Sequence, residues 1–215
     1  MKNIIFDMDG TLIDSSEAIT NSVNFVRSQI GLPPIDKETV TKNINLPDAD
    51  LPKIFYNTNE YKEEHRELFR KHYHNECITN IKLYPGIKEV LEILSKDFTL
   101  SIATNASDFF AIKMLKHLEI DNYFQTVLGR NNVENVKPHP EIVEKTLNLL
   151  NGKRENSLLI GDSEKDEMTA KNAKIGFIFV EWGFGKPLSN PKTASNTKDL
   201  IELVCETFNH SLTLL

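Results

Sequence analysis

The sequence predicts an α/β protein: a doubly wound, Rossmann-like parallel-sheet core with a small helical cap domain inserted after the first strand. Beyond about residue 83, short apolar runs alternate with segments whose apolar residues recur at helical spacing, a pattern typical of a parallel sheet covered on both faces. Residues 15–80 break that alternation, because helical patterns stand where a strand is due. We therefore assign residues 1–14 and 81–215 to the α/β core domain and residues 15–80 to the helical cap domain.

The chain begins with an apolar run at residues 3–8, which indicates a strand buried on both faces. The following segment indicates an amphipathic helix, in which Ser15 or Ser16 offers an N-cap and Gly31 ends the helix. Its apolar residues lie at helical spacing, at Ile19, Val23, Val26 and Ile30.

The rest of the expected cap has a different composition. Residues 32–52 are rich in proline and polar residues, which favours a loop with short helical turns. Residues 60–76 are dense in charge and indicate a solvated helix.

The core pattern continues to the end of the chain. Further strands are expected at residues 98–104, 126–129, 157–161 and 176–180. Helices are expected from Ile87 to Leu94 and at residues 107–118, 140–150, 164–174 and 197–208.

Composition limits the function classes. The net charge is -6, from 25 basic and 31 acidic residues, which argues against nucleic-acid and anionic-membrane partners. No segment approaches the roughly 20 apolar residues of a membrane span. The first apolar run, residues 4–6, is too short for a signal peptide, and Cys77 and Cys205 lack CxxC spacing, which favours reduced thiols. We expect a cytoplasmic protein that is a monomer or a homodimer.

Polar residues follow the ends of the expected strands. Asp7 and Asp9 end the first strand, Thr104 and Asn105 end another, and Asp162 follows residues 157–161. A further polar residue, Lys137, lies in the loop after residues 126–129. Ligands of open parallel sheets bind outside the carboxyl ends of the strands. We therefore expect these side chains to converge on one edge of the sheet.

This set of side chains supports phosphate chemistry. Asp7, Asp9 and Asp162, with Asp166 one helical turn further on, repel one another strongly unless a hard divalent cation such as Mg²⁺ lies between them. A lysine and a hydroxyl beside that metal suit a phosphate group, and one aspartate can then act as nucleophile while another transfers protons. Gly161 keeps side chains away from a bound ligand, and the helix that starts near Ser163 directs free N–H groups at it.

Four short motifs, taken in order, resemble those of the haloacid dehalogenase-like phosphohydrolases. They are "DMDGT" at residues 7–11, "ATN" at 103–105, "KPHP" at 137–140 and "GDSEKD" at 161–166. The resemblance covers nearly the whole chain, including a helical cap after the first motif. It implies an α/β hydrolase core and a Mg²⁺-dependent reaction on a phosphate ester.

The resemblance also implies a role for each matching residue. Asp7 is the expected nucleophile and a metal ligand, and Asp9 is the expected general acid and base, which binds the metal through its backbone carbonyl. The expected phosphate-binding residues are Gly10, Thr104, Asn105 and Lys137. The expected metal ligands are Asp7, Asp9, Asp162 and Asp166, the last directly or through water.

The resemblance favours a phosphatase that acts on a small-molecule phosphate ester. Asp9 indicates phosphate-ester hydrolysis or phosphoryl transfer, because a carboxylic acid protonates the leaving oxygen. "DGTLIDS" and the later "WGFG" at residues 182–185 are most similar to the phosphoglycolate phosphatase branch, although related nucleotidases, pyrophosphatases and sugar phosphatases share most of this pattern. Two alternatives stay open: a β-phosphoglucomutase-type phosphoryl transferase, and a non-catalytic regulatory protein that binds phosphate or metal.

Structural roles compete with the catalytic ones for several motif residues. Asp7 could cap the turn that follows the strand, Lys137 could lie on the surface before a proline turn, and Asp166 could stabilise a helix dipole. Asn105 could be a plain turn residue. Trp182 and Phe184 pack a loop against the edge of the site or shape substrate access.

The cap segment also offers basic residues whose role the sequence leaves open. His65, His72 and His74 are expected on a solvated face, with a zinc site as the alternative, and His139 near the edge of the site. Surface solvation is also the simplest role for Arg66, Arg70 and Lys71, and the alternative is contact with an anionic group of the substrate.

Overall fold

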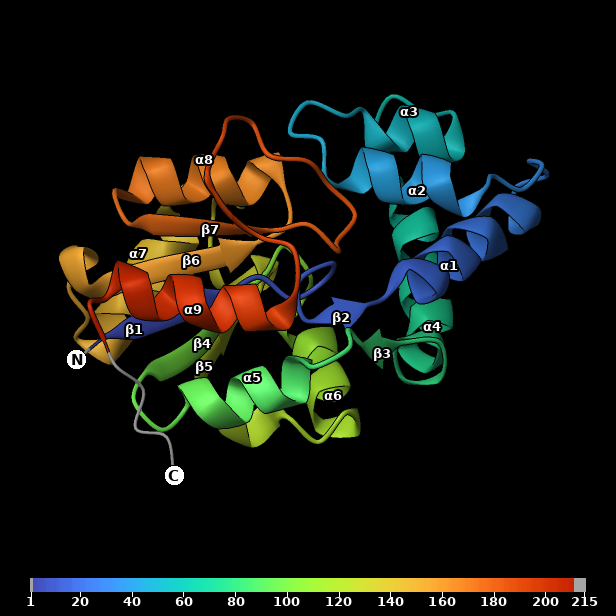
Figure 1. The fold of residues 1–215 in the computed structure, drawn as a ribbon. Helices are drawn as coiled ribbons and strands as arrows, with labels where there is room; N and C mark the ends of the chain where they lie inside the picture. Colours follow the sequence, from blue (N-terminus) through green and yellow to red (C-terminus); the bar gives the residue numbers. More distant parts are fainter. Residues whose placement is uncertain (1, 211–215) are drawn as a thin grey trace.

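A parallel sheet forms the centre of the computed structural model, which describes residues 2–210 (Figure 1). Within that range the sheet has six strands in the order β5-β4-β1-β6-β7-β8. The strands are β1 (Asn3–Phe6), β4 (Thr99–Ala103), β5 (Phe124–Leu128), β6 (Ser157–Gly161), β7 (Gly176–Val180) and β8 (Lys192–Ala194). The doubly wound α/β core predicted from the sequence is confirmed.

The central strand β1 pairs in parallel register with β4 on one side and β6 on the other. Ile5 is opposite Ser101 of β4 and Leu159 of β6. The strand ends at Phe6, two residues before the predicted end, because the chain turns after Asp7 to bring the Gly10 N–H within 2.8 Å of the Ile13 carbonyl. The edge strand β8 was not predicted, since its three residues carry no apolar run.

Helices cover both faces of the sheet. The bounds of these helices are α5 (Ile87–Leu94), α6 (Asp108–His117), α7 (Glu141–Leu150), α8 (Glu164–Ala173) and α9 (Thr197–Thr207). Ile4 and Phe6 of β1 pack with residues of α5, α6 and α9, whereas Ile5 packs with residues of α7 and α8. Alternate side chains of β1 therefore point into two different layers of the core.

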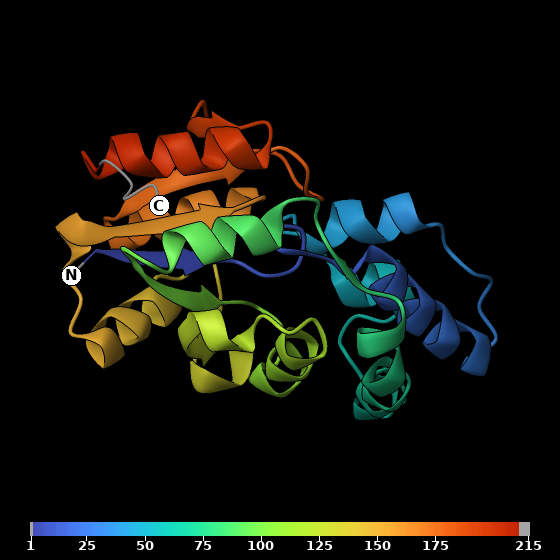
Figure 2. The same ribbon diagram turned by 60° about the horizontal axis from the view of Figure 1, so that its bottom comes forward.

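Four helices lie beyond one end of the sheet, and we call them the α1–α4 unit (Figures 1 and 2). They are α1 (Ser16–Gln29), α2 (Lys37–Ile44), α3 (Leu51–Tyr56) and α4 (Glu63–Thr79). The unit has a hydrophobic cluster of its own, whose buried members are Val23, Val26, Val40, Phe55 and Tyr56. It is joined to the core by an antiparallel ladder between β2 (Ile13–Asp14) and β3 (Lys82–Leu83).

Residues 32–52 are more helical than predicted. Two aspartates supply the start signals, since the Asp36 carboxylate accepts the Thr39 N–H at 2.7 Å and the Asp50 carboxylate accepts the Lys53 N–H at 3.2 Å. The helices α2 and α3 therefore take up much of the expected loop with short helical turns. The prolines lie outside α2 or in the first turn of α3.

The solvated face predicted for the histidines of α4 is wrong for His65, and His72 is half-buried. His65 is only 2% exposed and lies edge-on to the Tyr56 ring, with centroids 5.1 Å apart. The His72 ring stacks on Phe25 at 4.3 Å, while His74 is exposed as expected. One face of α4 is buried against α1 and α3, although the sequence of α4 is dense in charge.

Both cysteines are free thiols, and Cys77 is buried. None of the helices that the structure describes is both long enough and apolar enough to cross a membrane.

Candidate active site

Three residues far apart in sequence meet at the carboxyl end of β1. The Lys137 ammonium donates to Asp7 Oδ1 at 2.5 Å and to Asp166 Oδ1 at 2.6 Å. All three side chains are buried. Asp7 is held at the sheet by its N–H, which donates to the Ile160 carbonyl of β6 at 2.8 Å. Lys137 is therefore an interior residue that bridges two carboxylates, and not a surface lysine.

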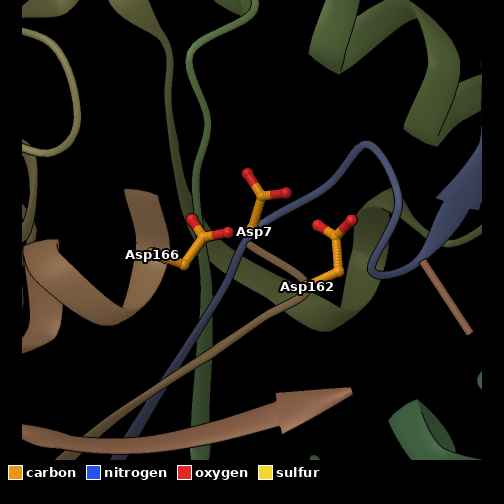
Figure 3. A group of neighbouring side chains, drawn as sticks. All are labelled: Asp7, Asp162 and Asp166. Atoms are coloured by element: carbon orange, nitrogen blue, oxygen red, sulfur yellow. The ribbon is translucent and has the colours of Figure 1, made fainter. Parts of the chain in front are cut away.

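Asp7, Asp162 and Asp166 form a buried acidic triad (Figure 3). One oxygen from each carboxylate lies within 4.8 Å of the others. Among residues 2–210 this is the only cluster of three or more His, Cys, Asp or Glu residues arranged to hold a metal ion, so the zinc alternative at His65 and His72 has no ligand set there. The three carboxylates share one ammonium, that of Lys137, which contacts Asp7 and Asp166, so negative charge is in excess.

Burial and this excess charge shift the pKa values of the triad. Burial raises the pKa of Asp7 well above its usual range, and the carboxylates of Asp166 and Asp162 raise it further against the opposing effect of Lys137. Burial, followed by the Asp166 charge, raises the pKa of Asp162 to about 7. Burial alone would lower the pKa of Lys137, but Asp166 and Asp7 outweigh it and raise that pKa.

Asp162 is held by hydrogen bonds from three segments of the chain. Its Oδ2 atom accepts the backbone N–H of Phe184 at 2.7 Å, the N–H of Gly185 at 3.3 Å and the side-chain amide of Asn45 at 3.1 Å. Its Oδ1 atom accepts the Thr11 hydroxyl at 3.3 Å. Oδ1 therefore keeps more room for a further ligand than Oδ2.

The loop at residues 182–185 closes tightly around Asp162. A Cβ atom at Gly183 or at Gly10 would overlap the Asp162 side chain, and Gly10 also has a left-handed φ of +88°. The Trp182 indole N–H donates to the Thr11 carbonyl at 3.0 Å, which ties the loop to the first motif. The "WGFG" segment therefore packs against the site and supplies donors to an aspartate of the triad.

Asp166 points into the site from the first turn of α8. Ser163 is the N-cap of this helix, and its hydroxyl donates to Asp166 Oδ2 while Lys137 binds Oδ1. Asp166 is only 1% exposed. Its carboxylate is thus fixed by two side chains and takes part in the triad, beyond any stabilisation of the helix dipole.

Asp9 lies beside the triad and has a separate partner. The Ser15 hydroxyl donates to Asp9 Oδ1 at 2.5 Å. Ser15 occupies the N-cap position of α1, as predicted, but its side chain makes no capping hydrogen bond. Burial raises the pKa of Asp9 although Ser15 and Lys137 oppose the shift, so burial favours the protonated carboxyl group.

Thr104 and Asn105 follow β4 at the same edge of the sheet. Thr104 is buried, and its Oγ1 atom accepts the Ala106 N–H at 3.1 Å, which leaves the hydroxyl proton available to donate. The Asn105 side chain both donates to the Lys137 carbonyl and accepts the Lys137 N–H, each at 3.0 Å. Asn105 thereby fixes the backbone of Lys137, and its contact with phosphate stays a prediction.

A cleft of about 620 Å³ opens between α4 and α6. Arg70 and Lys71 line it from α4, and Ser107 and Phe109 line it from the turn that follows Asn105 and from α6. Arg70 also pairs with Glu63 at 2.7 Å. The cleft is therefore basic and partly aromatic, and none of the residues that line it is one of the triad carboxylates, Lys137 or Thr104.

The other basic and imidazole side chains have different surroundings. The Arg66 guanidinium lies 5.1 Å from the centre of the Tyr61 ring. His139 is half exposed, and its ring accepts the Glu141 N–H at 3.2 Å.

The sequence did not predict the hydrogen bonds that four residues contribute to the site. Asn45 lies 117 positions from its partner Asp162, and no local pattern marks that contact. The backbone N–H groups of Phe184 and Gly185 carry no side-chain signal at all. The position of Ser15 before a helix indicates an N-cap, and nothing local indicates that its hydroxyl binds Asp9.

Comparisons with known proteins agree with this geometry. A family model described as haloacid dehalogenase-like hydrolase matches residues 4–180. A phosphoglycolate phosphatase of Aquifex aeolicus is 34% identical over 208 residues, which cover 95% of this chain and 97% of that protein. The pyrophosphatase PpaX of Halalkalibacterium halodurans is 31% identical over 176 residues, which cover 81% of each protein.

Among solved structures, a haloacid dehalogenase-like family hydrolase from Streptococcus pneumoniae superposes with a TM-score of 0.82 at 27% identity. The superposition covers 95% of this chain and 98% of that one.

Proposed function

This chain belongs to the haloacid dehalogenase-like hydrolases, and we propose that it is a Mg²⁺-dependent phosphatase that hydrolyses a small-molecule phosphate monoester through a phospho-aspartyl intermediate. The observation that carries the proposal is the buried Lys137 ammonium between Asp7 and Asp166, with Asp162 completing the triad. A buried set of charges with an unbalanced negative sum is costly unless it binds a cation or reacts.

The triad fits a hard divalent cation. Mg²⁺ prefers oxygen ligands and keeps several of its waters, and the triad offers one buried carboxylate oxygen from each of three residues. We assign Asp7, Asp162 and Asp166 as ligands, with the backbone carbonyl of Asp9 as a further one. When bound, the cation neutralises the carboxylates and polarises the phosphoryl group.

The reacting groups of the chain divide into binding and transfer roles. Lys137 and the Thr104 hydroxyl bind the phosphoryl oxygens, supported by Gly10 and Asn105, while Asp7 attacks phosphorus. Asp9 donates a proton to the leaving oxygen of the ester. It then takes a proton from the water that attacks the phospho-aspartate, which releases phosphate and restores both carboxyl groups.

We propose that residues 15–80 act as a cap that covers the site and selects the substrate, while residues 1–14 and 81–215 form the hydrolase core. The support is that the α1–α4 unit has its own hydrophobic cluster and joins the core through the short β2–β3 ladder. The basic cleft at Arg70 and Lys71 then favours substrates with an anionic leaving group.

The relatives named above supply two substrate candidates, phosphoglycolate and pyrophosphate. We favour phosphoglycolate, because that relative is the more similar and matches nearly the full length of this chain. A cytoplasmic enzyme, monomeric or homodimeric, without nucleic-acid or membrane partners, is part of the proposal.

A screen of phosphorylated metabolites tests the proposal. The protein is incubated with and without Mg²⁺ against phosphoglycolate, pyrophosphate, sugar phosphates, nucleotides and p-nitrophenyl phosphate. We expect Mg²⁺-dependent release of phosphate, with the largest kcat/KM for phosphoglycolate. Isomerised sugar phosphate from β-glucose 1-phosphate with a bisphosphate primer would identify a mutase. No turnover of any compound would leave a non-catalytic binding protein.

A further inference from the structure

The carboxyl end of α2 makes two hydrogen bonds to the fourth motif of the core. The Lys165 ammonium donates to the Ile44 carbonyl at 2.7 Å. The side-chain amide of the next residue, Asn45, donates to Asp162 Oδ2 at 3.1 Å. Adjacent residues at the end of one helix of the α1–α4 unit thus contact two residues of "GDSEKD", which are three positions apart.

Lys165 is well suited to hold the end of α2. The last carbonyl groups of a helix lack partners within the helix, and Ile44 is the final residue of α2. A cation at this end also interacts favourably with the helix dipole. Lys165 is partly buried, so water weakens this bond less than it would on an open surface.

Asn45 connects the same helix end to the acidic triad. Asp162 Oδ2 also accepts the N–H groups of Phe184 and Gly185, which both belong to the core. Among the described donors to this oxygen, Asn45 is the one that the α1–α4 unit supplies. Moving α2 away from the core would therefore remove one donor from Asp162 and leave the others in place.

We propose that Asn45 and Lys165 form a clasp that holds the α1–α4 unit over the site and couples its placement to the orientation of Asp162. Both are positioning residues: Lys165 anchors the end of α2, and Asn45 turns Asp162 so that its Oδ1 atom faces the other two carboxylates of the triad. The second half of this inference rests on the proposed function, because it treats Asp162 as a metal ligand.

Amide hydrogen exchange of the metal-free protein tests the clasp without any substrate. The variants are Asn45→Ala and Lys165→Met. Matched controls are Asn43→Ala, whose side chain bonds within α2 to the Thr39 carbonyl, and Lys171→Met on the exposed surface of α8. We expect amides of residues 42–50 to exchange about tenfold faster in both clasp variants and at the wild-type rate in both controls. A tenfold change is at the lower end of the effect expected when a hydrogen bond to a charged group is lost.

The double variant Asn45→Ala with Lys165→Met tests whether the two bonds act together. If one clasp joins the α2 end to the core, losing either bond frees the other, so the double variant exchanges about as fast as each single variant. Exchange rates that multiply in the double variant would show two independent contacts and overturn the coupling.

Binding of Mg²⁺, measured by calorimetry without substrate, tests the link to Asp162. Asn45→Ala and Lys165→Met should each weaken Mg²⁺ binding by roughly threefold to tenfold, and the controls should not. Unchanged exchange in both clasp variants would overturn the clasp. Faster exchange with unchanged Mg²⁺ binding would overturn the coupling to Asp162.

Lys165→Met also has a distinguishing outcome. A raised KM with exchange at the control rate would show that Lys165 contacts the substrate and does not hold α2. The exchange result stands whether or not the protein proves to be a phosphatase, so failure of the clasp and failure of the proposed function are separable.

Discussion

The carboxyl end of the sheet and the α1–α4 unit are built in different ways. At the carboxyl end of the sheet, Asp7 and Asp162 directly follow the last residues of β1 and β6, and paired strands therefore fix their distance. In the α1–α4 unit, helices pack around a small cluster that includes Val26 and Phe55, and the bridge to the core is a short ladder. Backbone pairing between neighbouring strands positions the groups at the carboxyl end of the sheet, whereas the α1–α4 unit is held by one short ladder and by side-chain contacts.

The two regions have different proposed roles: catalysis at the carboxyl end of the sheet and substrate choice in the α1–α4 unit. The charged groups that we assign to catalysis are buried and cross-linked, as Lys137 is between Asp7 and Asp166. The groups that we assign to substrate choice, such as Arg70, lie on the exposed face of α4. Substitutions in the first region should abolish turnover, and substitutions in the second should change the kcat/KM of individual substrates.

The largest expected effect comes from Asp7→Asn. The amide cannot attack phosphorus, so kcat should fall about 10⁴-fold or more, while the fold survives because the two side chains have the same shape. Steady-state phosphate release and thermal melting measure the two effects. Asp48→Asn, in an exposed loop of the α1–α4 unit, is the control with unchanged kcat. Retention of more than a tenth of the rate by Asp7→Asn would show that another group is the nucleophile.

Lys137→Met should have the next largest effect. It leaves the Asp7 and Asp166 carboxylates buried beside each other without their ammonium, which costs roughly 3–5 kcal/mol of stability in the metal-free protein. The kcat/KM value should fall about 10²–10³-fold with the loss of a phosphate-binding charge. Urea unfolding and initial rates measure both, and Lys116→Met on the exposed face of α6 should change neither. A variant of wild-type stability would contradict the bridging role.

The triad should make the metal-free protein sensitive to pH. The pKa of Asp162 is raised by burial and by Asp166 to about 7, above its ordinary value of 3.8, so the folded state binds more protons than the unfolded state between these values. The contribution of Asp162 to the free energy of unfolding is therefore largest below about pH 4, and it is lost as the pH rises towards 7.

Thermal melts across this pH range measure the loss, against Asp162→Asn as the control that lacks the titrating group. Saturating Mg²⁺ should restore stability near pH 7, because the cation binds the ionised carboxylates. Stability that rises through this range by the same amount in wild type and in Asp162→Asn would contradict the account.

Phe55→Ala should affect the α1–α4 unit and spare the sheet. Removing a buried ring typically costs about 3–5 kcal/mol, here taken from a cluster separate from the clusters around the sheet. Hydrogen exchange should accelerate in α1–α4 while β1 and β6 stay protected, and kcat/KM should fall roughly tenfold. Equal acceleration in both regions would show that they unfold as one body.

Arg70→Ala should have the smallest effect. Its ion pair with Glu63 is exposed and worth less than about 1 kcal/mol, so stability should hardly change. The KM of an anionic substrate should rise about threefold from the lost positive charge in the cleft. Glu63→Ala, which frees Arg70, should leave KM unchanged or lower it. Higher KM in both variants would point to the ion pair itself and away from attraction of the substrate.

The contrast between the sheet and the α1–α4 unit explains why the sequence predicted the sheet better than the unit. The bounds of β6 and β7 were predicted to the residue, because apolar runs and turn residues mark strand ends locally. Once the strand ends are known, a parallel sheet brings Asp7 and Asp162 together whatever the packing around them.

The contacts of the α1–α4 unit depend on tertiary placement. His65 is buried by packing on Tyr56 of the neighbouring helix α3, and the Asn45 contact with Asp162 joins residues 117 positions apart. The α2 helix begins at a local signal, the Asp36 cap, within a segment whose prolines and polar residues favoured a loop. The edge strand β8 was missed for a related reason, since its pairing with β7 and not its composition makes it a strand.

The most direct test of the central claim is to locate a divalent cation in crystals grown with Mn²⁺, whose anomalous scattering identifies it. The account predicts an ion bound by one oxygen each of Asp7, Asp162 and Asp166, and absent from crystals of Asp162→Asn. A triad without an ion at saturating Mn²⁺, or an ion held elsewhere while the enzyme is active, would contradict it.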